Sequence, residues 1–263
     1  MLISNEKLVY LKKLRKEKIL VISFRILLLV IFLIIWELLA QLKLINTFTF
    51  SSPSQIWNTF INLITNGNLF KHLWITIYEV LISFLLSSSI GLIISIILWR
   101  SKILAKIIDP YLMVLNSLPK VALGPLIIIW VGASINSIIF MSLLISTFIT
   151  IINIYISFNN TDKSYITLMK SFKATKKQIF TKVVFPSNLE NIISALKINI
   201  SMNLIGVIMG ELLVSKEGIG YLIMYGSQVF NINLVITGVF VLGIISYLMY
   251  YGIDKLEKAV SKK

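Results

Sequence analysis

Six long apolar windows, separated by short polar or basic segments, dominate the pattern of the chain. Each is close to the roughly 20 helical residues needed to cross a hydrocarbon core of about 30 Å. The windows are 20–42, 74–99, 111–131, 135–157, 189–213 and 233–253. The pattern predicts an all-α, polytopic membrane protein with six transmembrane helices.

The third window is interrupted by Pro119, Lys120 and Pro125. Each proline removes a backbone donor and clashes with the preceding turn, so we expect a broken helix. Backbone defects survive in a bilayer only where protein or a water-filled cavity shelters them. Residues 116–125 are therefore expected to face the inside of the bundle, either as a packing kink or as part of a translocation path.

Composition supports the membrane assignment, because 57% of the residues are hydrophobic, 14% are charged and the mean hydropathy is +0.90. A soluble globule would need more polar surface. There is no cysteine, and the single histidine, His72, cannot build a metal cluster. Walker phosphate loops, Gly-x-Ser-x-Gly elbows and His-Glu-x-x-His motifs are also missing from the sequence. We expect no metal, no cofactor and no ATP hydrolysis by this chain.

Charge predicts the orientation. If the N-terminus is cytoplasmic, six spans place all but five of the 25 Lys and Arg residues on the inner side, which is a strong positive-inside bias. The five exceptions are Lys43, Lys71, Lys120, Lys197 and Lys216. The predicted organisation is a basic cytoplasmic N-terminus (1–19), a transmembrane domain (20–253) and a cytoplasmic tail (254–263) in the cell membrane. The net charge of +14 lacks the interleaved aromatics of a nucleic-acid surface, so anionic lipid is the expected partner and nucleic acid is not.

The segment of about 160–186 is a basic, amphipathic loop between the fourth and fifth windows. Asp162 and its neighbours can cap a helix in which positions 166, 169 and 172 recur at helical spacing. Thr175 can cap a second helix, which should end where Pro186 disfavours a helical Phe185. The segment is predicted to be a helix-turn-helix at the cytoplasmic surface.

Two interpretations of this loop remain open. It can be an interfacial element held by anionic lipid and buried aliphatic side chains. It can also be a docking element whose apolar knob, Phe172, Ile179 and Phe180, enters a groove on a soluble partner. Both need the same pattern, so periodicity does not choose between them.

The loop resembles the EAA loop of permease subunits of binding-protein-dependent ATP-binding cassette (ABC) importers. That loop reads Glu-Ala-Ala, three residues, Gly-Ala-Ser and then a proline 13 positions after the glycine. Here Lys173 takes the place of the glycine, Ala174 and Thr175 match Ala-Ser, Phe172 matches the usual leucine, and Pro186 stands at the proline position. Residues 167–169, Thr-Leu-Met, replace Glu-Ala-Ala, and lysine lacks the easy access of glycine to positive φ.

Four further segments resemble the same family. They are Trp36-Glu37, the Ser-Ser-Pro-Ser run at 51–54, Ile108-Asp109-Pro110 opening the third span, and Gly210-Glu211 through Gly218 to Ile223. In this order and spacing they are similar to the nitrate, sulfonate and taurine branch of importers.

The resemblance implies a transport subunit that works by alternating access and does no chemistry itself. It implies two cytoplasmic ABC ATPases, an extracellular substrate-binding protein and a dimer, with a homodimer favoured because one chain carries six spans. ATP is then used by the partner subunits. The ATPase-docking residues that it implies are Phe172, Ala174, Thr175, Ile179, Phe180 and Pro186.

Polar residues within the windows are the candidates for the translocation path. They are Asn116, Ser117, Lys120, Asn153, Asn199, Ser201 and Asn203. A charge at the bilayer centre costs about 2.5–3.5 kcal/mol on insertion scales. Lys120 therefore either lies in the cavity, where it would favour anions, or extends to the cytoplasmic interface.

Three glutamates and a run of small residues are expected to be structural. Glu37 and Glu211 fall near the outer ends of spans, where they can reach interfacial water, and Glu79 lies shallow in the second span. Hydrogen bonding is a better expectation for them than proton relay. The run at 87–89, Ser-Ser-Ser, with Gly91 fits close helix packing.

Two other classes of function are alternatives: an integral membrane hydrolase and a transporter that uses no ATPase. An integral membrane hydrolase would need an activated pair such as Lys120 and Ser117. A transporter without an ATPase often carries inverted repeats, which the halves of this chain do not clearly show. The sequence leaves open whether the cargo is a sulfonate, taurine, nitrate, bicarbonate or a thiamine precursor, and whether the dimer is homomeric.

Overall fold

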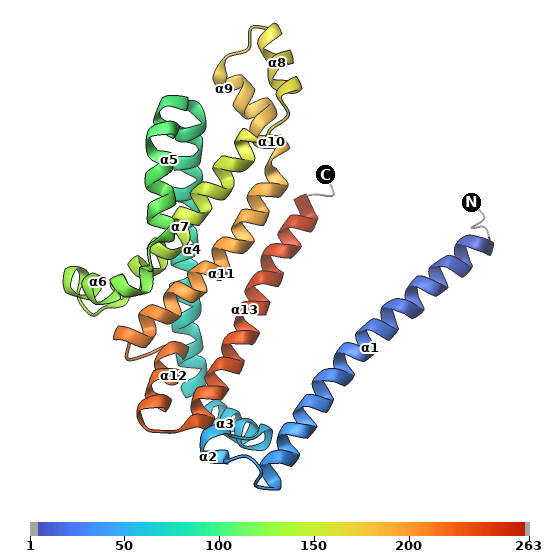
Figure 1. Ribbon diagram of the computed structural model, residues 1–263, viewed down its shortest axis with the longest axis vertical. Helices are drawn as coiled ribbons and strands as arrows, with labels where there is room; N and C mark the ends of the chain where they lie inside the picture. Colours follow the sequence, from blue (N-terminus) through green and yellow to red (C-terminus); the bar gives the residue numbers. More distant parts are fainter. Residues whose placement is uncertain (1–4, 261–263) are drawn as a thin grey trace.

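The computed structural model describes residues 5–260, in which every regular element is helical (Figure 1). Residues 1–4 and 261–263, including Lys262 and Lys263 of the predicted tail, lie outside the described residues. In chain order the elements are α1 (Asn5–Gln41), α2 (Thr47–Phe50), α3 (Pro53–Thr65), α4 (Asn68–Arg100), α5 (Lys102–Ser117), η1 (Lys120–Leu123), α6 (Gly124–Val131), α7 (Ile135–Asn159), α8 (Lys163–Ser171), α9 (Lys176–Ile179), η2 (Phe180–Val184), α10 (Phe185–Ser187), α11 (Leu189–Val214), α12 (Ile219–Gln228) and α13 (Ile232–Val260).

The predicted spans match this order of helices. In the described residues α1, α4, α7, α11 and α13 are each long and apolar enough to cross a membrane, and α5 with η1 and α6 forms a sixth candidate bent by 83°. The bend follows Ser117 and contains Pro119, so the predicted broken helix is confirmed. The N-terminal segment predicted at 1–19 continues into the first span as one helix from Asn5.

The third span does not begin where the sequence suggested. Pro110, expected to open the span, lies inside α5, which begins at Lys102. The side chain of Ser101 caps this earlier start by accepting a hydrogen bond from Leu104 N at 3.3 Å. The helix then continues through Pro110, which supplies no backbone donor.

The centre of the bundle is the three-helix contact of α4, α7 and α11 (Figure 1). Small residues allow the close approach. A Cβ added at Gly206 of α11 would lie 2.5 Å from Cα of Ser142, and one at Gly210 would lie 2.9 Å from Cα of Ile138. Gly91 of α4 faces Thr150 in the same way, which confirms the predicted packing role of its neighbourhood. In membranes, where apolar side chains gain little by leaving lipid, such contacts drive helix association.

A buried hydrogen-bonded network joins the same three helices. Asn203 Nδ2 donates to Ser87 Oγ at 2.9 Å, and Asn203 Oδ1 accepts from Ser142 Oγ at 2.8 Å and Ser146 Oγ at 3.0 Å. Asn199 Oδ1 accepts from Ser87 Oγ at 3.1 Å. These side chains are fully buried, so each polar atom finds its partner within the bundle.

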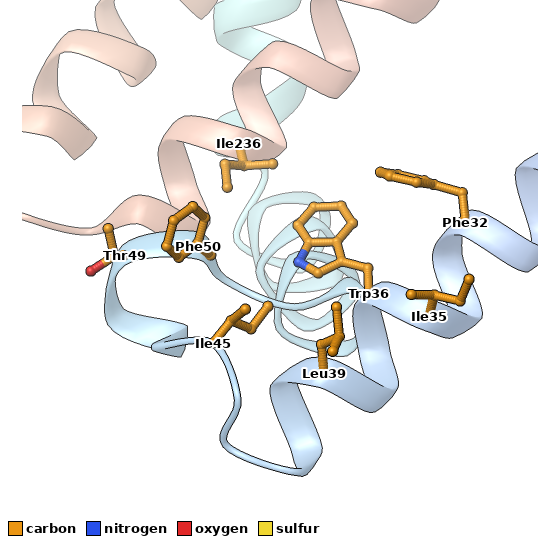
Figure 2. Close-up of a pocket in the computed structure, with 8 residues that line it drawn as sticks. All are labelled: Phe32, Ile35, Trp36, Leu39, Ile45, Thr49, Phe50 and Ile236. Atoms are coloured by element: carbon orange, nitrogen blue, oxygen red, sulfur yellow. The ribbon is translucent and has the colours of Figure 1, made fainter.

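Helix α1 stands apart from the bundle over most of its length and approaches the remaining helices only near its C-terminal end (Figure 1). There Glu37 Oε2 accepts a hydrogen bond from Ser54 N, at 3.0 Å, in the first turn of α3. Beside this contact an apolar groove of about 410 Å³ is lined mainly by α1 and α2 with Ile236 of α13, and Trp36 points into it (Figure 2). The groove contains none of the residues predicted for the translocation path.

The beginning of α1 and the end of α13 lie toward the end of the molecule that carries α8 and α9 (Figure 1). Both are therefore on the same side as the central loop, as an even number of spans requires. That this side is cytoplasmic stays a prediction from the distribution of Lys and Arg.

The network predicts the effect of losing Asn203. Asn203→Ala removes its bonds to Ser87, Ser142 and Ser146. Because interhelical hydrogen bonds in membranes are worth about 0.6 kcal/mol each on average, we expect a loss of about 2 kcal/mol in the free energy of unfolding. Denaturation in mixed detergent micelles measures it. Asn62→Ala, on exposed α3 surface, is the control and should change little; equal effects of the two substitutions would contradict the prediction.

Candidate functional site

The loop between α7 and α11 is built from two capped helices. Asp162 Oδ1 accepts from Ser164 N at 2.8 Å at the start of α8, and this backbone hydrogen bond lowers the pKa of Asp162. At the start of α9, Thr175 Oγ1 accepts from Gln178 N at 3.3 Å while Gln178 Oε1 accepts from Thr175 N at 2.8 Å. The second pair is a capping box. Both predicted caps are therefore present, at the starts of two short helices.

The turn between the two helices has the geometry of a glycine turn. Lys173 has φ of 55°, Lys173 N donates to Lys170 O at 2.8 Å, and Ala174 N donates to Met169 O at 3.0 Å. These two bonds form a Schellman motif, which glycine adopts most easily. Lys173 therefore adopts, at a steric cost, a backbone conformation that favours glycine.

The loop divides its apolar residues between an exposed tip and a buried base. Phe172 is 74% exposed at the turn, whereas Ile179 is only 5% exposed. The ring of Phe180 packs 5.1 Å from Trp99 and 5.3 Å from Phe158. The expectation that Ile179 and Phe180 form an exposed knob with Phe172 is thus corrected, because Ile179 at the end of α9 and Phe180 at the start of η2 pack against the membrane helices. Periodicity defines a face but does not say what covers it.

The return from the loop to α11 also differs from the prediction. Residues 180–184 form a π-helical turn, and Phe185 has helical angles, φ of −65° and ψ of −49°. Pro186 therefore does not exclude a helical Phe185, because Pro186 stands in the first turn of the next short helix, α10. A proline is tolerated there, since its missing N–H would have no partner.

A buried side-chain bond closes the base of the loop. Asn188 Nδ2, at the start of α11, donates to Thr161 Oγ1, beyond the end of α7, at 2.7 Å. Asn188 also bonds Val184 O at 2.8 Å. The two ends of the loop are thus held together at the junction of α7 and α11.

The broken third span brings some of the predicted path residues together. Lys120 Nζ donates to Asn116 Oδ1 at 3.3 Å and to Ile145 O at 3.4 Å, and it lies 5.5 Å from the centroid of the Phe148 ring. Asn116 is exposed and Lys120 is half-buried. Ser117 Oγ donates to Met113 O at 2.8 Å, so its hydroxyl proton is held by the backbone.

The remaining path candidates lie elsewhere. Asn153 is half-buried on α7, and Ser201 is half-buried and donates to Lys197 O at 3.3 Å. Asn199 and Asn203 belong to the buried network of α4, α7 and α11 and are fully buried. The structure therefore does not place these residues in one group with Asn116, Ser117 and Lys120.

The sequence analysis did not predict that Glu79 and Glu211 are both buried. Each is only 1% exposed, so the expectation that Glu211 reaches interfacial water is wrong. Both lie in a buried polar cluster with Thr76 and the turn before α12. The sequence does contain a signal for a buried polar face on α4, because the residues at 72, 76, 79, 83 and 87 are polar and recur at helical spacing.

Comparison with known proteins defines the class of this chain. Residues 87–263 match the family described as binding-protein-dependent transport system inner membrane component. The chain therefore belongs to this family of ABC importer permeases, and it is a multi-pass membrane protein and not an enzyme. Membership of this family argues against the integral membrane hydrolase that Lys120 and Ser117 suggested.

Individual relatives are transport permeases of small solutes. The putative aliphatic sulfonates transport permease protein SsuC of Bacillus subtilis is 30% identical over 87% of this chain and 83% of its own length. The formylaminopyrimidine transport permease protein ThiX of Halalkalibacterium halodurans is 29% identical over 86% and 89%. Among solved structures, a chain of the inward-facing MetNI methionine ABC transporter has a TM-score of 0.67 at 19% identity, over 74% of this chain and 97% of that one. The fold is shared with that transporter.

The strained turn makes a prediction about local stability. Lys173→Gly removes the penalty of about 1–2 kcal/mol that an L-residue meets in the left-handed region, and part of this is offset by the greater freedom of unfolded glycine. We expect the turn to gain about 1 kcal/mol. Hydrogen exchange of the Ala174 amide, which bonds Met169 O, measures the gain. Lys173→Ala is the matched control and should gain nothing, and unchanged protection in the glycine variant would contradict the interpretation.

Proposed function

We propose that this chain forms the translocation path of an ABC importer for a small anionic or heterocyclic nutrient, as a dimer of two permease subunits. The proposal is supported by its family and by relatives whose names specify sulfonates and formylaminopyrimidine. It places α8 and α9 on the cytoplasmic side, under the bundle, where separate ATPase subunits bind. An extracellular binding protein delivers the solute to the opposite side.

Phe172 carries this proposal. It is a large aromatic side chain, 74% exposed at the tip of a helical loop that projects beyond the membrane helices. Leu168 and Tyr165 are exposed on the same short helix, so the tip offers a small apolar surface with lysines around it. A groove on a soluble partner would bury this surface, as amphipathic helices are commonly recognised.

The other residues of the loop serve its geometry. Ala174 completes the Schellman turn, Thr175 caps α9, and Pro186 begins the short helix that leads to α11. Ile179 and Phe180 bind the loop to the membrane helices and do not contact the ATPase. We infer that closure of the ATPases moves this anchored loop as a unit with α7 and α11, and that this motion drives alternating access.

The path itself is proposed to run along the broken third span. Asn116, Ser117 and Lys120 place polar groups on an irregular segment that is partly exposed, and irregular backbone at membrane depth indicates a cavity. Lys120 would attract an anionic solute, with Asn116 orienting its ammonium group. Asn153 and Ser201 stay candidates, whereas Asn199 and Asn203 hold the helices together.

Replacing the exposed aromatic tests the docking site. Phe172→Asp puts a charge where an apolar pocket is expected, so we expect loss of at least about tenfold in ATPase affinity, equivalent to about 1.4 kcal/mol. Co-purification of the ATPase with the tagged chain measures it. Phe230→Asp is the matched control, because Phe230 is 75% exposed on the turn between α12 and α13, toward the opposite end of the molecule (Figure 1). Normal ATPase recovery with Phe172→Asp would contradict the proposal.

Replacing the lysine of the broken span tests the path. Lys120→Gln removes a positive charge but retains a polar side chain, and hydrogen bonds to charged groups are worth about 1.5–3 kcal/mol. We expect uptake of an anionic solute by proteoliposomes containing the complete transporter to fall about tenfold or more. Lys106→Gln, on the exposed surface of α5, is the control. Equal uptake by the two variants would remove Lys120 from the path.

A further inference from the structure

The carboxyl groups of Glu79 and Glu211 meet in the interior of the protein. Glu79 lies on α4 and Glu211 near the end of α11, and each is 1% exposed. Thr76, one turn before Glu79 on the same face of α4, donates to Glu211 Oε1 at 2.6 Å, so the two carboxyl groups are neighbours. Two carboxylates buried side by side repel strongly, and such pairs in proteins commonly share a proton. The surroundings show which of the two holds it.

Glu211 is surrounded by hydrogen-bond donors that suit an ionised carboxylate. Its Oε1 accepts from Thr76 Oγ1 at 2.6 Å, and its Oε2 accepts from Gly220 N at 2.5 Å in the first turn of α12. A helix N-terminus favours a negative charge. The backbone of Gly218, with φ of 103°, lies so close that a Cβ there would collide with the carboxyl group of Glu211. Glu211 is therefore the member of the pair that carries the charge.

Glu79 has the surroundings of a neutral acid. Its Oε2 is buried without a hydrogen-bond partner, and Ser83 Oγ, one turn further along α4, is likewise buried without one. An ionised carboxylate with an unpartnered oxygen in such a place is strongly disfavoured, whereas a neutral carboxyl group needs only to donate its proton. The neighbouring Glu211 is the acceptor within reach.

The charged and titratable neighbours do not neutralise the pair. Lys71 pairs with Glu217 at 2.5 Å on exposed surface. His72 Nδ1 accepts from Gly218 N at 2.9 Å, so its ring is neutral with the proton on Nε2. Tyr221 stacks on His72 at 5.8 Å between ring centroids. Within residues 5–260, the ion pairs found involve other carboxylates than Glu79 and Glu211.

We propose that Glu79 and Glu211 form a proton-binding site, in which Glu79 holds a resident proton at neutral pH and donates it to the Glu211 carboxylate. The proton joins α4 to Glu211 of α11, whose carboxylate also accepts from Gly220 N in the first turn of α12. Loss of the proton would leave two adjacent buried charges and push α4 and α11 apart. This site does not depend on the ATPase or on the proposed solute path.

Infrared spectroscopy of the purified full-length chain tests the proton directly. In a detergent without ester groups at neutral pH, the wild-type protein should show the carbonyl band of a protonated carboxylic acid. Glu79→Gln should abolish the band. Glu217→Gln is the matched control, because it changes an exposed glutamate that follows Glu211 closely in the sequence. This variant should retain the band. A wild-type spectrum without the band, or a band that persists in Glu79→Gln, would overturn the proposal.

Thermal unfolding provides an independent second measurement. Glutamine can donate to Glu211 as a neutral acid does, so Glu79→Gln should unfold within about 2 °C of the wild type. Glu211→Gln deprives Thr76 and Gly220 of their charged acceptor and should lower the midpoint by roughly 5 °C or more. If Glu79→Gln unfolds as early as Glu211→Gln, or does not fold, Glu79 is not the neutral member and the assignment is wrong.

Discussion

The buried polar contact of α4, α7 and α11 is the interaction on which the rest of the structure depends. Apolar side chains gain little by leaving lipid for a protein interior, so close packing and hydrogen bonding must hold membrane helices together. Gly206 and Gly210 bring α11 against α7, and Asn203 then bonds side chains of both neighbouring helices. The central loop connects α7 to α11, and α12 continues from α11. The positions of the central loop and of the Glu79–Glu211 pair therefore depend on this contact.

The base of the loop between α7 and α11 is packed against the membrane helices. Phe180 packs on Phe158 of α7 and Trp99 of α4, and Asn188 bonds Thr161 across the two ends of the loop. The tip, in contrast, is a nine-residue helix that ends in a strained turn with an exposed aromatic side chain. The loop is thus divided between a packed base and an exposed tip. Lys173 adopts the left-handed backbone of the turn at the steric cost that an L-residue meets there.

Glutamates organise the opposite end of the molecule. Glu37 of α1 accepts from the first turn of α3, and Glu211 of α11 accepts from the first turn of α12. In each case a carboxylate from a long helix satisfies backbone donors at the N-terminus of a short one, where the helix dipole favours it. Through these contacts Glu37 meets Ser54, and Glu211 meets Gly218 and Gly220.

The sequence by itself determined the class of the protein, the spans, the break in the third span and the caps of α8 and α9. These features depend on local chemistry: the length of an apolar run, the missing donor of a proline, and an oxygen placed to accept from the next turn. Only the tertiary structure decided that Ile179 and Phe180 face inward, that Asn203 bonds its neighbours and that Glu79 meets Glu211. A helical pattern specifies which residues share a face, but the partner of that face comes from helices distant in the chain, and one sequence carries no record of that pairing.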